Sequence, residues 1–180
     1  MKLLLGKVAG TFTKPTCRFV VSGFYPILSP RSDFDIFDEF AVLDHLLGLH
    51  GLGFPLHLDR GPVIDQIVKL SMQFWRESDV AISQAVSETA ALNALGNRMI
   101  FAPNPFTEEN ALFAGAPWLW GFNKSLQPED EVIAGRKEGC RLQYGDPLRF
   151  MERELCGYAS LGHPNVTGAQ QIGRAILQAM

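Results

Sequence analysis

The chain has 180 residues, of which 47% are hydrophobic and 19% charged, and its formal net charge at pH 7 is −3. This length suffices for one domain with a hydrophobic core, and the small excess of acidic residues argues against a nucleic-acid or anionic-membrane surface. No apolar run approaches the ~20 residues that a membrane-spanning helix needs, so we expect no transmembrane segment.

The chain begins with a predicted helix and a predicted strand. Residues 3–8 indicate the end of a helix, and Lys7 interrupts this apolar start, so we expect no signal peptide in it. After the turn at Pro15, residues 18–23 form a compact apolar run that is typical of a buried parallel strand. Residues 33–49 are apolar with interspersed acids and predict a further helix.

The longest predicted element is a helix over residues 62–95. Its apolar residues recur at three-to-four spacing with one gap at Asp79, and Gly96 ends it. Residues 98–102 then read as a second short apolar strand. A strand, a helix and a strand in this order predict a parallel βαβ unit, which makes the fold class α/β.

Aromatic and polar residues follow both predicted strands. Because the carboxyl ends of parallel strands meet at one edge of a sheet, we expect these residues to lie near one another. Residues 108–130 predict a long loop whose tryptophans either wall a pocket or cover the edge of the core. The candidate substrate-binding residues on these segments are Phe24, Tyr25, Asn104, Phe106, Trp118 and Trp120.

The last part of the chain combines a short charged helix, predicted over residues 146–155, with a histidine turn. Residues 157–169 read GYASLGHPNVTGA, which places His163 on a Gly-bounded turn before Asn165, a good N-cap for a C-terminal helix. A loop histidine supported by a helix is suited to proton transfer near neutral pH. The alternative is that His163 is a surface histidine with no functional role.

This block resembles the last sequence block of the SGNH (GDSL-type) hydrolases, which are esterases and lipases. There an Asp-x-x-His is followed by Pro, a small polar cap, a Gly one turn later and the C-terminal helix. Ser160 occupies the place of the Asp, and the run at residues 23–26 resembles the Gly-Tyr-x-Pro strand ending of larger bacterial members. The matching residues of the block are His163, Pro164, Asn165, Gly168 and Ala169.

The resemblance implies a truncated flavodoxin-like, three-layer α/β fold with a short parallel sheet and flanking helices. Residues 1–180 would form a single domain, the C-terminal part of an SGNH hydrolase domain. The family's Gly-Asp-Ser nucleophile run is not in this sequence, nor is a Gly-x-Ser-x-Gly elbow. We therefore expect His163 to be the general base of an esterase- or lipase-like Ser–His hydrolase whose nucleophile-bearing part is missing from this sequence. We expect this chain alone to be inactive.

The expected partners are a small-molecule or lipid ester and the missing N-terminal half of the fold, with no cofactor and no nucleic acid. The alternative function is a non-catalytic α/β binding or interaction module that retains the hydrolase scaffold. Two kinds of group compete to orient His163. We favour the backbone carbonyl of Ser160, because a tight turn brings it close, over a carboxylate such as Asp146 or Glu154.

The cysteines and the other histidines support more limited expectations. Cys17 lies beside the first strand and predicts a free core thiol. Cys140 and Cys156 bracket a polar loop. In an extracytoplasmic or secreted parent protein, which we favour, these two cysteines would form a disulfide, whereas in a cytosolic protein all three cysteines would be reduced. The remaining histidines, near Asp44 and Asp59, fit none of the usual ligand spacings, so we expect no metal site. They are His45, His50 and His57.

Overall fold

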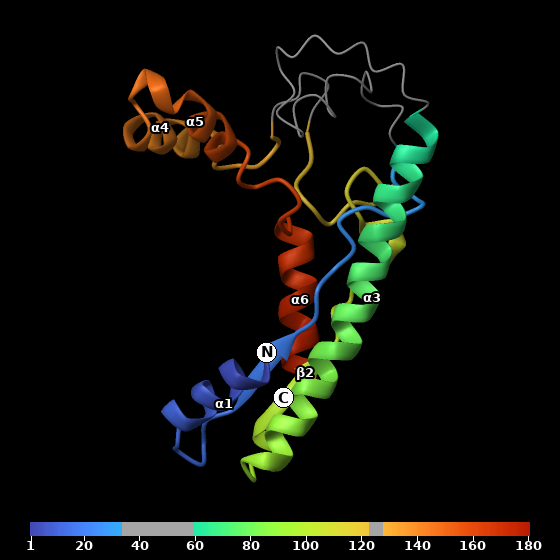
Figure 1. Ribbon diagram of the computed structural model, residues 1–180, viewed down its shortest axis with the longest axis vertical. Helices are drawn as coiled ribbons and strands as arrows, with labels where there is room; N and C mark the ends of the chain where they lie inside the picture. The colour runs from blue at the N-terminus through green and yellow to red at the C-terminus, as the bar shows by residue number, and fades with distance from the viewer. Residues whose placement is uncertain (34–59, 123–127) are drawn as a thin grey trace.

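The computed structural model describes residues 1–33, 60–122 and 128–180 (Figure 1). The helix predicted over residues 33–49 therefore falls almost entirely outside the described residues, and so do His45, His50 and His57. Within the described part of the chain, none of the helices has the length and apolar character required to cross a membrane.

A short parallel sheet joins two distant parts of the chain. Strand β1 (Phe19–Ser22) pairs with β2 (Met99–Ala102), with Phe19 opposite Met99 and Ser22 opposite Ala102. Helix α3 (Arg60–Leu92) and the 3-10 turn η1 (Gly96–Arg98) connect them. The α/β class and the parallel strand–helix–strand unit are confirmed, with boundaries within three residues of those predicted.

The hydrophobic core lies between this sheet and two helices, α1 (Lys2–Thr11) and α3. Its buried members are Leu5, Ala9, Ile82, Ala85, Val86, Leu95 and Met99. Phe19 and Val21 of β1 pack against them, so these alternate residues point to the α3 side of the sheet. Helix α6 (Val166–Ala179) also contacts both strands but is not part of this cluster, which places it against the opposite face (Figure 1).

Helix α6 begins where the sequence predicts. The side chain of Asn165 accepts a hydrogen bond from the Gly168 N–H at 3.0 Å, which satisfies one of the free donors of the first turn. The apolar residues of α6 are only partly covered: Ile172 and Ile176 are half-buried, whereas Val166 is 50% exposed.

A helical hairpin lies away from the strands, formed by α4 (Ile133–Gln143), the short turn η3 (Pro147–Arg149) and α5 (Phe150–Gly157) (Figure 1). The sequence predicted the charged helix before the histidine turn but not α4. Only Cys140 of α4 is buried, and two glycines interrupt it, so it lacks the apolar stripe by which a helix is recognised. Cys140 therefore lies inside a helix and does not bracket a polar loop.

Candidate functional site

Backbone hydrogen bonds hold the histidine turn on both sides. The N–H of His163 donates to the Ser160 carbonyl at 2.9 Å, and the carbonyl of His163 accepts from the Trp120 N–H at 2.9 Å. The Trp120 carbonyl in turn accepts from the Gly162 N–H at 3.1 Å, and Gly162 has a φ of +69°, which glycine adopts without strain. The result is a fixed backbone that presents an exposed imidazole.

The aromatic loop runs alongside this turn. Leu119 and Pro164 form an antiparallel bridge, and the Asn165 N–H donates to the Trp118 carbonyl at 2.8 Å. The amide of Asn165 also donates to the Pro117 carbonyl at 3.0 Å. The loop and the histidine turn, which the sequence places about 45 residues apart, are therefore one structural unit.

Three rings connect this unit to the carboxyl ends of the strands. Tyr25 stacks on Phe106 with ring centroids 4.9 Å apart, and Trp118 meets the same ring edge-on at 5.2 Å. Phe106 is only 3% exposed and packs with Leu112 and Leu119. Phe106 therefore supports the site from beneath and is too covered to line a pocket, whereas Tyr25 and Trp118 are half-buried.

Polar groups tie together the segments that follow the strands. Asn104 donates through its amide to the Gly23 carbonyl at 3.3 Å and accepts the Phe106 N–H at 3.1 Å. Asp79, the gap in the apolar stripe of α3, accepts the Phe24 N–H at 3.1 Å, and burial raises the pKa of its carboxyl group. A Cβ on Gly23 would lie 2.1 Å from Oδ1 of Asp79, so any side chain at position 23 would displace this carboxylate.

The remaining predicted site residues differ in their surroundings. The ring of Phe24 is 45% exposed and lies against Phe74, with centroids 5.2 Å apart. Trp120 is half-buried beside the histidine turn. The structure thus brings Tyr25, Phe106 and Trp118 into contact, whereas Phe24 packs on α3.

A buried carboxylate that the sequence did not single out lies behind the turn. Asp130 is 4% exposed and accepts the Ser160 hydroxyl at 2.7 Å. The Arg136 guanidinium binds both of its oxygens, at 2.7 Å for Oδ1, and this pairing holds the pKa of Asp130 down at about 2 against the cost of burial. No periodicity relates residues 30 positions apart, so the sequence alone had no pattern by which to find this pair.

Two of the groups proposed to orient His163, the Ser160 carbonyl and Asp146, bond to backbone N–H groups. The Ser160 carbonyl accepts the backbone N–H of His163, and within the described residues the imidazole has no hydrogen-bond partner. Asp146 caps η3 by accepting the Leu148 N–H at 2.9 Å. The side chain of Glu154 lies outside the described part of the structure.

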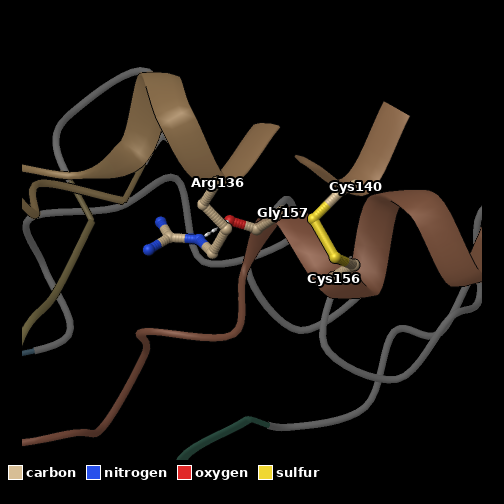
Figure 2. The surroundings of a disulfide bond; sticks show 4 residues. All are labelled: Arg136, Cys140, Cys156 and Gly157. Carbon is tan, nitrogen blue, oxygen red and sulfur yellow. Dashed lines mark hydrogen bonds between the residues drawn. A yellow bond between two sulfur atoms is a disulfide. The ribbon is translucent and has the colours of Figure 1, made fainter. Parts of the chain in front are cut away.

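The helical hairpin is cross-linked close to this carboxylate. Cys140 of α4 and Cys156 of α5 form a disulfide, and Arg136 donates through Nε to the Gly157 carbonyl at 3.1 Å (Figure 2). Figure 2 shows the rest of the guanidinium directed away from the disulfide. Cys17 is a free, half-buried thiol.

A hollow lies on another part of the molecule. It has a volume of about 850 Å³ and is lined by Ser29, Pro30 and Ser32 and by one face of α3 from Ile64 to Glu77. The hydroxyls of Ser29 and Ser32 at its edge donate to backbone carbonyls, each at 2.6 Å. Its described lining includes none of the candidate site residues.

The arrangement around His163 is suited to proton transfer, because an exposed imidazole on a fixed backbone can take and return a proton. Among the described residues, no three His, Cys, Asp or Glu side chains are grouped to hold a metal ion. Comparison with protein-family models, with curated proteins and with solved structures found no match. What this chain does must therefore be inferred from its own residues.

Proposed function

We propose that this chain is the histidine-bearing part of a serine ester hydrolase with a truncated flavodoxin-like fold. His163 is its general base and acid, and the nucleophilic serine comes from a segment outside this sequence. The observation that carries the proposal is the exposed imidazole on a turn held by backbone bonds to Ser160 and Trp120. The Trp118–Phe106–Tyr25 contacts connect that turn to the carboxyl ends of the parallel strands, where sites form in α/β proteins.

In the proposed reaction, the serine hydroxyl attacks the ester carbonyl while His163 accepts its proton. His163 then returns the proton to the leaving alcohol, and water repeats the sequence on the acyl-enzyme. The hydroxyl of Ser160, within the histidine turn, is already committed, because it donates to Asp130 at 2.7 Å. This supports a nucleophile supplied from elsewhere.

The proposed substrate is a small-molecule or lipid ester. The exposed ring of Phe24 and the half-buried rings of Tyr25, Trp118 and Trp120 offer apolar surface for an acyl or alcohol group. The Asn104 amide is held by the backbone and is suited to orienting a polar part of the substrate.

One observation favours the alternative, a non-catalytic α/β binding or interaction module. Within the described residues, nothing holds the second ring nitrogen of His163, whereas a catalytic histidine needs one nitrogen fixed so that the other faces the nucleophile. In that case the aromatic surface alone would be the functional feature.

The test begins with the chain by itself. We expect no hydrolysis of p-nitrophenyl acetate above that of free imidazole and no labelling by a fluorophosphonate probe. Labelling of any serine in this chain would contradict the proposal.

The second step adds the protein segment encoded upstream, within ~200 residues, about one domain's length. A segment that contains Gly-Asp-Ser should restore ester hydrolysis when co-expressed. The variant His163→Ala should lose this hydrolysis, and His57→Ala, which removes a different histidine, should retain it. Hydrolysis that survives His163→Ala would refute the role of His163, and an upstream region without Gly-Asp-Ser would favour the binding module.

A further inference from the structure

The hairpin of α4 and α5 is joined to the histidine turn through one carboxylate. Oδ1 of Asp130 accepts from Arg136 and from the Val132 N–H at 3.2 Å, and Oδ2 accepts from Arg136 and from the Ser160 hydroxyl. The side chain of Asp130 is 3% exposed and that of Arg136 is 15% exposed. This carboxylate is therefore buried, paired and fully hydrogen-bonded, the condition under which a buried charge is tolerated.

Ser160 links this carboxylate to the catalytic candidate. Its hydroxyl donates to Asp130, and its carbonyl accepts the backbone N–H of His163 at 2.9 Å. The side-chain bond fixes the start of the turn, and the backbone bond fixes its end. A hydrogen bond to an ionised acceptor is stronger than one between neutral groups, so Asp130 is a firm anchor.

We propose that Asp130 is the positioning residue of the histidine turn: held by Arg136, it anchors Ser160 and thereby sets the backbone conformation of His163. Asp130 acts through Ser160, so it is distinct from an acid that would contact the imidazole. The pKa of Asp130, about 2, keeps its carboxyl group ionised at neutral pH. Asp130 therefore does not change its charge in the near-neutral pH range in which a histidine exchanges protons. Only the consequence for turnover rests on the proposed ester hydrolase function.

A second ion pair on the same helix provides a matched control. Glu138 and Arg141 pair on the outside of α4, with side chains 55% and 60% exposed. Exposed pairs of this kind contribute little to stability. Neither residue contacts Ser160 or the histidine turn in the structure, so the variant Glu138→Gln should leave the turn unchanged.

The first test is amide hydrogen exchange by NMR on the intact chain. The His163 amide, bonded to Ser160, and the Trp120 amide, bonded to the His163 carbonyl, report directly on the turn. In Asp130→Asn and in Ser160→Ala we expect these amides to exchange at least ~10-fold faster, as expected for the loss of a charge-assisted hydrogen bond. Ser160→Thr keeps the hydroxyl and should restore slow exchange.

Amides of β1 and β2 should keep their wild-type exchange in every variant, which separates a local effect from global destabilisation. If Asp130→Asn fails to fold, Ser160→Ala, which removes one hydroxyl, decides the question. A folded Ser160→Ala chain with unchanged exchange at His163 and Trp120 would overturn the proposal, and so would an equal change in Glu138→Gln.

The second test uses the co-expressed enzyme. Ser160→Ala should lower kcat with little change in KM, because a displaced base affects the proton transfer and leaves substrate binding intact. The two proposals fail separately. Faster exchange at His163 without any ester hydrolysis by the wild type would refute the hydrolase function and leave the role of Asp130 intact.

Discussion

Replacing Gly168 by alanine tests how closely α6 must approach the aromatic loop. A Cβ at Gly168 would lie 2.3 Å from the Trp118 carbonyl oxygen, 3.0 Å from Cζ of Phe106 and 3.2 Å from Cβ of Pro164. The first contact is with backbone, which cannot rotate away as a side chain can. That same carbonyl accepts the Asn165 N–H at 2.8 Å, so moving it disturbs the residue that caps the helix.

The expected loss of stability follows from three terms. Overpacking a core costs about 1–3 kcal/mol, and the disturbed hydrogen bond adds about 1 kcal/mol. Alanine is the better helix former by about 1 kcal/mol, which offsets part of the cost. Gly168→Ala should therefore lower the free energy of unfolding by about 1–3 kcal/mol.

Gly173 is the matched control on the same helix. No atom lies within 4 Å of a Cβ built there, so Gly173→Ala adds the helix preference of alanine without a clash. It should raise stability by up to about 1 kcal/mol. Urea unfolding followed by far-UV circular dichroism measures both variants at one temperature. If Gly168→Ala is as stable as the wild type, or if the two variants shift alike, the close approach of α6 to Trp118 is wrong.

Two further predictions concern the region around the histidine turn. Pairing with Arg136 lowers the pKa of Asp130 to about 2 from its ordinary 3.8. The ionised Asp130 therefore stabilises the folded protein fully at pH values above 3.8, and this contribution is lost as the pH falls through about 2. This contribution amounts to roughly 2 kcal/mol at neutral pH. The difference in the free energy of unfolding between the wild type and Asp130→Asn should therefore shrink from about pH 5 towards pH 2. A difference that stays constant over this range would contradict the pairing. For the disulfide between Cys140 and Cys156, intact-mass analysis should find one alkylated cysteine, Cys17, before reduction and three after it. Three alkylations without reductant would show that the pair is open, with a loss of about 3 kcal/mol expected for a loop of this size.

Local patterns in the sequence determined the parts of the fold that are stabilised locally. Both strands were predicted as short apolar runs and α3 by its three-to-four spacing, and the structure confirms them. The start of α6 was also predictable, because an N-cap such as Asn165 bonds to a residue three positions along its own helix. Structure that is stabilised by interactions between residues a few positions apart can be predicted from local sequence patterns.

Helix α4 lay beyond such reasoning, because distant contacts hold it in place. It buries only Cys140, which is bonded to Cys156 of the next helix, and its Arg136 reaches both Asp130 and the Gly157 carbonyl. A helix with two glycines and no apolar stripe shows little of this in its own residues.

The candidate site divides in the same way. The sequence by itself determined that His163 stands on a turn before a capped helix, since turn and cap are short-range structures. Only the tertiary structure decided that Phe106 is covered by Tyr25 and Trp118, and that the Ser160 hydroxyl meets Asp130 from 30 residues away. Such pairs depend on how the helices pack on the sheet, and no spacing along the chain encodes them.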